Sequence, residues 1–115
     1  MTQPVHEMKA ELFKTLAHPL RIRVLEALAG GDMVVADIAA AVEASGPLLS
    51  QHLGVLRRAG IVASRREGGS VVYSVVDPRV FDLLNVGRRI LTSTLDDARE
   101  ALSDSSEIVY DSAGS

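Results

Sequence analysis

A serine, a histidine and two arginines lie close together in the segment GPLLSQHLGVLRRAGIV, residues 46–62. Ser50 and His52 are the residue types of a nucleophile and its general base. Arg57 and Arg58 beside such a pair would suit a catalytic site. The same residues also fit one helix that has a buried side and an exposed side, so the local secondary structure decides which chemistry is possible.

Helical geometry removes the catalytic pair. Residues two positions apart on a helix do not face each other, so Ser50 and His52 are not placed to share a proton. The chain also has no paired carboxylates at a suitable spacing and no phosphate-binding loop, because Gly30-Gly31 and Gly68-Gly69 are breaks between elements. An enzyme is therefore the least favoured class.

At about 100° per residue, the segment divides into two faces. The apolar side contains Leu48, Leu49, His52, Leu53, Leu56 and Ala59. The other side contains Pro47, Ser50, Gln51, Gly54, Arg57 and Arg58. We expect His52 to be a core histidine with a local hydrogen bond, and the alternative is a base contact or a ligand.

The second face suits a helix that enters the DNA major groove, with little bulk at its start and arginines at its end. The alternative is an ordinary solvated helix face. Two more arginines, Arg65 and Arg66, precede Gly68-Gly69 in a β-branched segment, where a wing would reach phosphate or the minor groove.

The elements around this helix follow from hydrophobic periodicity. The spacing predicts helices over about 5–16, 18–29, 35–43 and 47–59, a hairpin that turns at Gly68-Gly69, and a long last helix after Asp77-Pro78. The fold class is mostly α with a small β-hairpin (α+β), a winged helix-turn-helix of order α-α-α-α-β-β-α. We expect one domain over residues 1–103 and a disordered tail over 104–115.

Three segments carry a resemblance to a known family. The segments FKTLAHPLRIRVLEAL, LLSQHLGVLRRAGIV and RREGGSVVYSV resemble the ArsR/SmtB family of bacterial winged-helix repressors, over about residues 8–102. The resemblance implies a homodimer formed by the first and last helices, binding to a double-stranded inverted-repeat operator, and release on an inducer that is often a metal ion. His18 lies where the family has a histidine before proline, and we expect it to cap or pack.

The sequence departs from the family where Gly46 and Pro47 replace polar residues. Base recognition would then depend on Ser45, Ser50, Gln51 and the arginines. The predicted DNA-contact residues are Ser45, Gly46, Pro47, Ser50, Gln51, Gly54, Arg57, Arg58, Arg65, Arg66 and Ser70. A protein-interaction module on the same fold is the alternative that the missing polar groups favour. The predicted dimer-interface residues are Met8, Leu12, Leu83, Ile90, Leu91 and Leu95.

Charge is unevenly distributed along the chain. The formal net charge is -3, but residues 45–76 contain four arginines and one glutamate, a local charge of +3. A basic patch on an acidic protein is still an electrostatic footprint for nucleic acid. No apolar run approaches the ~20 residues of a membrane span, and no signal peptide is apparent. We expect a cytoplasmic protein with no membrane partner.

The sensor site is the least determined feature. There is no cysteine, and the last helix has no histidine, so neither well-known family metal site carries over. The remaining candidate ligands are His6, Glu7, Asp96, Asp97 and Glu100. Nitrogen and oxygen donors suit Ni²⁺ first, then Co²⁺ or Zn²⁺, rather than thiolate-bound metals. The alternatives are solvated termini and a regulator controlled by a non-metal signal.

Overall fold

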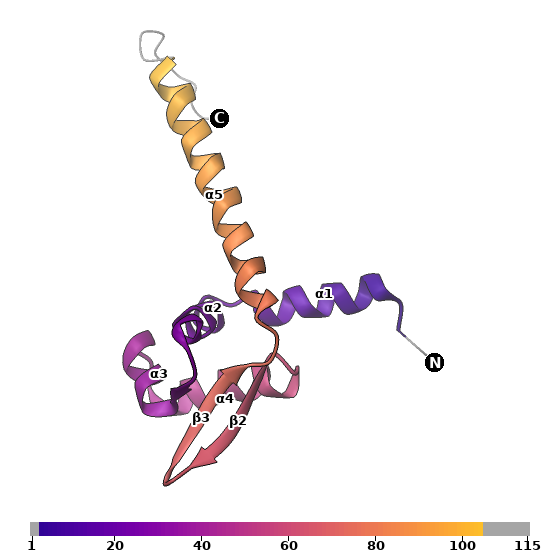
Figure 1. Cartoon of the computed structure of the whole chain (residues 1–115). Coiled ribbons are helices and arrows are strands. Elements are labelled where there is room, and N and C mark those ends of the chain that lie inside the picture. Colours follow the sequence, from indigo (N-terminus) through magenta and orange to yellow (C-terminus); the bar gives the residue numbers. More distant parts are fainter. Residues whose placement is uncertain (1–2, 105–115) are drawn as a thin grey trace. The chain divides into compact units, whose positions relative to one another are not determined.

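The computed structural model describes residues 3–104 of the chain. The elements are α1 (Val5–Leu16), α2 (Pro19–Ala27), the 3-10 helix η1 (Leu28–Gly30), β1 (Met33–Val34), α3 (Val35–Val42), α4 (Gly46–Arg58), β2 (Val62–Glu67), β3 (Ser70–Val75) and α5 (Arg79–Asp104) (Figure 1). The predicted succession of four helices, a hairpin and a long helix is confirmed. The bounds of α1 are as predicted, and those of α2, α3 and α4 differ from the predicted ones by at most two residues.

The chain divides into two compact units, one through Phe81 and one from Asp82 onward. The first unit contains α1 to α4 and the sheet, and the second contains most of α5. The predicted tail began at residue 104, but α5 continues through Asp104. The rest of that tail, residues 105–115, lies outside the described part of the chain.

Two of the helices begin at side-chain caps. The His18 Nδ1 atom accepts a hydrogen bond from the Leu20 amide at 3.2 Å, and Pro19 occupies the first turn of α2. The Ser45 Oγ atom accepts from the Leu48 amide at 3.4 Å, and Pro47 occupies the first turn of α4. Each cap satisfies an amide that has no partner within the helix, which fixes where the helix starts.

The sheet has three antiparallel strands in the order β1-β3-β2. The hairpin runs from the pair Val62 and Val75 to the pair Glu67 and Ser70. Only Gly68 of the Gly-Gly turn has a positive φ, of 63°, as a two-residue turn with glycine at its first position requires. The sequence predicts the hairpin alone, and β1 adds a third strand that pairs Met33 with Tyr73.

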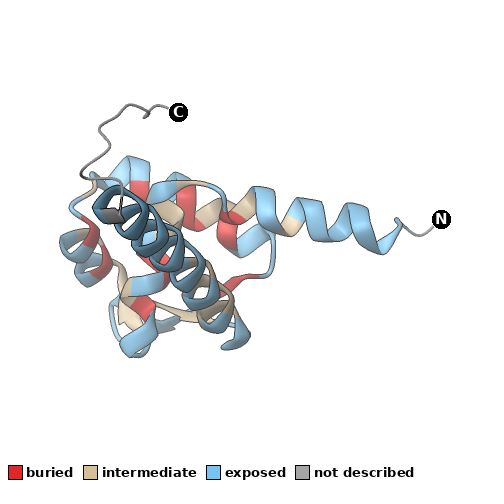
Figure 2. Ribbon diagram, turned by 90° about the horizontal axis from the view of Figure 1, so that it is seen from above, coloured by how far each residue is buried: buried red, intermediate tan, exposed pale blue. Residues whose placement is uncertain are grey.

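The core of the first unit is aliphatic. The residues that are at most 7% exposed are Leu16, Val24, Leu25, Leu28, Ile38, Val42, Leu49, Leu53, Leu56, Ile61, Val62, Val72 and one polar residue, His52. Figure 2 shows such buried positions in red on the helices and strands. They hold α2, α3 and α4 against one another and against the strands.

Two positions of the predicted apolar side of α4 are exposed, and that part of the prediction was wrong. Leu48 is 44% exposed, because it lies about 100° from Leu49 on the helix and borders the polar face. Ala59 is exposed because α4 ends at Arg58, so the helical projection does not extend to it.

Candidate nucleic-acid interface

The helix α4 has one buried face and one exposed face. Its buried residues are Leu49, His52, Leu53 and Leu56. Its exposed residues include Gly46, Pro47, Ser50, Gln51, Arg57 and Arg58, while Gly54 is half-buried. The predicted polar face is therefore accessible to a ligand in this unit. Ser50 and His52 lie on different faces, as predicted.

The first turn of α4 offers few polar groups. Ser45 uses one lone pair of its Oγ atom as an acceptor for the Leu48 amide, so its hydroxyl proton and one lone pair remain for another partner. Gly46 and Pro47 are exposed and bring no polar side-chain atom. Hydrogen bonds to base edges from this helix therefore depend mainly on Ser50 and Gln51 in the next turn.

The last turn of α4 is cationic. Arg57 and Arg58 are both exposed there, at the helix end where positive charge is favourable. The Arg58 guanidinium lies beside Gly54, with its Nη1 atom 3.2 Å from the position that a Cβ atom would occupy. A glycine at position 54 thus gives the arginine room to lie along the polar face.

The hairpin carries Arg65 and Arg66 on β2, and only one of them is free of carboxylates. Arg65 forms ion pairs with Asp32 at 2.8 Å and with Glu67 at 2.6 Å. Arg66 is exposed and makes no ion pair within residues 3–104. Ser70 is exposed opposite Glu67 at the start of β3. The patch is less basic than its sequence indicates, because the fold brings Asp32 to the hairpin.

His52 is a core histidine, as predicted, and its partner is an arginine of α2. The Arg21 Nε atom donates to His52 Nδ1 at 3.0 Å, and Arg21 Nη1 donates to the Thr15 carbonyl at 2.9 Å. The His18 ring lies 4.2 Å from the His52 ring, between centroids. Burial first, and then the neighbouring His18 and Arg21, lower the pKa of His52. This network connects α4 to α2 and to the end of α1.

Comparisons with known proteins match this architecture. The family model described as "Bacterial regulatory protein, arsR family" matches residues 18–64. The HTH-type transcriptional regulator Rv0081 of Mycobacterium tuberculosis is 46% identical over 104 residues, which is 90% of this chain and 91% of the relative. The chain belongs to the ArsR family.

Two solved structures show the same arrangement of elements. The crystal structure of Rv0081 has a TM-score of 0.76 at 47% identity and covers 84% of this chain and 98% of its own. The homodimeric winged helix-turn-helix DNA-binding domain Mb0332 of Mycobacterium bovis, a possible ArsR-family regulator solved by NMR, has a TM-score of 0.72 at 28% identity. It covers 81% of this chain and 86% of its own.

These matches give the elements their functional names. The protein is a transcriptional regulator of the ArsR/SmtB family with a winged-helix DNA-binding domain. Within that fold, α3 and α4 take the positions of the two helices of the helix-turn-helix, so α4 corresponds to the recognition helix, and β2 and β3 correspond to the wing. The relatives are named as regulators and not as enzymes.

The candidate metal ligands are divided between the two units of this ArsR-family chain, and His6 and Glu7 belong to the first. The His6 Nε2 atom lies 4.0 Å from a Glu7 carboxylate oxygen, and Asp96 lies 3.5 Å from Arg99. Asp97 and Glu100 are exposed on α5, in the other unit. Within residues 3–104, no group of three or more His, Cys, Asp or Glu side chains is placed to hold a metal ion.

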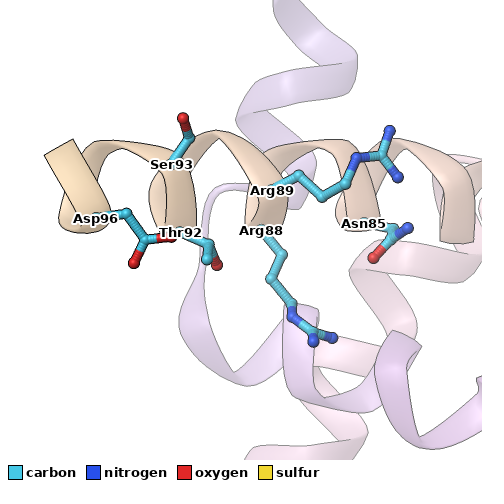
Figure 3. Close-up of a pocket in the computed structure, with 6 residues that line it drawn as sticks. All are labelled: Asn85, Arg88, Arg89, Thr92, Ser93 and Asp96. Carbon is cyan, nitrogen blue, oxygen red and sulfur yellow. The ribbon is translucent and has the colours of Figure 1, made fainter.

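The last helix has a polar face that was not predicted from the sequence. A pocket there is lined by Asn85, Arg88, Arg89, Thr92, Ser93 and Asp96 (Figure 3). Their spacing of three and four residues was the available signal. The face includes Asp96, a candidate metal ligand, together with two arginines.

Among the described helices, none is both long and apolar enough to cross a membrane.

The predicted dimer-interface residues are mostly exposed in the single chain. Met8 is 52% exposed, and Ile90, Leu91 and Leu95 are each at least 60% exposed. Leu12 and Leu83 are half-buried. Large apolar side chains repeated along one helix at this exposure are typical of a surface that a partner covers.

Proposed function

We propose that the protein is a homodimeric regulator that binds an inverted-repeat DNA operator through the polar face of α4 and through the wing. The observation that carries the proposal is the exposed face of α4, with Ser50 and Gln51 in its middle and Arg57 and Arg58 at its end. Short hydrogen-bonding groups followed by arginines suit a helix that reads bases and then reaches phosphate.

The dimer part of the proposal rests on the apolar residues of α5. Ile90, Leu91 and Leu95 expose most of their surface to water. Burial of this surface against a second copy is worth roughly 25 cal/mol per Å² of apolar area removed from water. Mb0332, the M. bovis relative, is described as homodimeric. Two recognition helices in a two-fold dimer would read half-sites about 34 Å apart.

Selection from a random duplex pool tests this function without a known operator. We expect the purified protein to enrich an inverted repeat whose half-site centres are separated by about 10 base pairs. Gln51→Ala should then reduce discrimination between the selected site and a mutated site by about 1 kcal/mol or more. Arg57→Ala is the matched control, since loss of a phosphate contact should weaken both duplexes equally. Enrichment of no sequence at all would contradict the proposal.

A protein-interaction module is the second candidate, and the exposed first turn of α4 favours it. Gly46, Pro47 and the 44% exposed Leu48 form an apolar start to the recognition helix. Duplex binding whose affinity falls steeply with salt would argue for DNA as the ligand. Duplex binding to the wild-type protein whose affinity does not change with salt would favour a protein partner.

No three His, Cys, Asp or Glu side chains of residues 3–104 are placed to hold a metal ion, so a site built on His6 and Glu7 would take its further donors from elsewhere, and we propose a second chain as their source. The expectation of Ni²⁺, Co²⁺ or Zn²⁺ therefore depends on the dimer, in which α1 of one chain would have to approach Asp96, Asp97 or Glu100 of the other. The proposed DNA-binding function does not depend on such an ion. A regulator of this kind would act in the cytoplasm, where the chromosome is.

A further inference from the structure

The two adjacent arginines of the wing have different surroundings. Arg65 places its Nε atom 2.6 Å from a Glu67 oxygen and its Nη1 atom 2.8 Å from an Asp32 oxygen. Two of its five N–H groups are thus bonded to carboxylates from two different segments of the chain. Asp32 lies in the turn before β1, and Glu67 ends β2. We call these three residues the wing brace.

The pleat of the strand separates the arginines further. Successive side chains of a strand point to opposite faces, so Arg65 and Glu67 share one face of the hairpin and Arg66 projects from the other. Arg66 is exposed, lies one residue nearer the turn than Arg65 and is opposite Val71. It has no carboxylate partner within residues 3–104.

The net negative charge of the wing brace opposes the binding of DNA phosphate by Arg65. One guanidinium and two carboxylates have a formal charge of -1. A phosphate that approached Arg65 would meet two adjacent carboxylates and could bond the Nε edge only by displacing Glu67, whereas no carboxylate of residues 3–104 is paired with Arg66. The two arginines therefore cannot be equivalent phosphate ligands, although their residue types are identical.

We propose that Arg65 is a positioning residue that ties the wing to the segment before α3, and that Arg66 is the wing residue that binds DNA phosphate. This assignment rests on the proposed DNA-binding function. It divides the predicted pair of wing contacts into one structural and one ligand-binding role. Asp32 becomes part of the same device, although it is far from the wing in the sequence.

The salt dependence of binding to a mixed-sequence duplex of about 30 base pairs tests the ligand-binding half. Arg66→Ala should reduce the slope of log Kobs against log [salt] by about 1 per protomer. Arg65→Ala is the matched variant, with the same loss of charge one position away, and should leave the slope unchanged. If Arg65→Ala reduces the slope as Arg66→Ala does, and Arg65→Lys restores it, then Arg65 binds phosphate and the assignment is wrong.

Amide hydrogen exchange in the DNA-free protein tests the positioning half. Arg65→Ala and Asp32→Asn should each make exchange of the β2 and β3 amides about two- to fivefold faster, the range expected when an exposed ion pair is lost. Arg65→Lys should not restore protection, because a single ammonium does not reproduce a fork that bonds two carboxylates. Arg66→Ala should leave exchange unchanged. Unaltered exchange in Arg65→Ala would show that Arg65 is no brace.

The two measurements separate failure of the assignment from failure of the proposed function. A wild-type protein that binds no duplex at low salt would contradict DNA binding, and with it the role of Arg66, while the exchange measurement would still decide the role of Arg65. A circular dichroism melt of each variant checks that it is folded. We expect each variant to fold, because all three residues of the wing brace are substantially exposed.

Discussion

At the scale of single residues, His52 connects protonation to the position of the recognition helix. Its Nδ1 atom accepts a hydrogen bond from Arg21, so that nitrogen must carry no proton. A protonated ring would lose this bond and place a positive charge against Arg21 and His18 in the core. Burial and these two neighbours accordingly hold the pKa of His52 below its usual 6.5.

This lowered pKa predicts a pH dependence of stability. Below about pH 6.5 the unfolded chain takes up a proton at His52 that the folded chain resists, so the free energy of unfolding should fall as the pH falls from 6.5 towards the native pKa of His52. The stabilisation is fully present above pH 6.5. A single group contributes at most about 1.4 kcal/mol per pH unit.

Urea denaturation of His52→Gln at pH 7.5, 6.5 and 5.5 measures this contribution. The variant should lose part of the pH dependence, at a cost in stability of about 1–3 kcal/mol at pH 7.5 for a disturbed core position. His6→Gln is the control, because His6 is exposed on α1. Equal pH dependence in the wild type and in His52→Gln would mean that His52 does not titrate differently on folding.

At the scale of elements, α4 contains a glycine, Gly54, that lowers the stability of the helix and leaves space for the Arg58 side chain. Gly54→Ala should raise the free energy of unfolding by about 0.5–1 kcal/mol, because alanine has the higher helix propensity and the helix backbone suits it. The new Cβ atom would lie 3.2 Å from the Arg58 guanidinium, which moves aside at little cost. Duplex affinity should fall meanwhile, because a methyl group and a displaced arginine occupy the polar face.

A thermal melt and a duplex titration of the same Gly54→Ala sample measure both effects. Ala40→Gly, on the exposed side of α3, provides the reverse exchange on a helix without a proposed base contact. It should lower the free energy of unfolding, and it should leave duplex affinity unchanged under conditions where the variant is folded. Improved DNA binding by Gly54→Ala would argue that this turn of α4 does not face the duplex.

The elements were largely predictable because their signals are local. The caps at His18 and Ser45, the Gly68 turn and the apolar spacing of each helix all lie within the segments that they define. The strand β1 was not predictable, because two residues carry no periodicity and Met33 becomes a strand only by pairing with Tyr73. A pairing between distant segments leaves no pattern in a single sequence.

The site was predictable to the same limit. The polar face of α4 and the burial of His52 follow from helical spacing and agree with the structure. The partner of His52 and one partner of Arg65 were missed, since Arg21 and Asp32 lie in other segments and are more than thirty positions away. Sequence therefore located the basic residues, while the fold decided which of them are free to bind.

At the scale of the whole molecule, the long helix α5 exposes more apolar surface than a solitary chain would keep. Leu91→Glu should give monomers and raise the dissociation constant of the dimer at least about a hundredfold, because an uncompensated polar group in an apolar seam costs several kcal/mol. Operator affinity should fall as well, because the two half-sites are then read by separate molecules.

Sedimentation equilibrium of Leu91→Glu and Thr92→Glu measures this effect with a matched pair. The two positions are adjacent and both exposed, but Thr92 belongs to the polar face of α5. Thr92→Glu should stay dimeric. A wild-type protein that sediments as a monomer at the concentration where it binds DNA tightly would contradict the dimer.

The short strand β1 also constrains how the chain acquires its structure. It pairs Met33 with Tyr73, and the whole helix-turn-helix lies in the stretch between them. Closing a loop of that length costs chain entropy that is recovered only when both ends meet. During synthesis, the recognition helix can form early, but the three-stranded sheet beside it is incomplete until the middle strand β3 has left the ribosome. The DNA-binding elements should therefore become competent together and late, in a single step governed by long-range pairing rather than helix by helix.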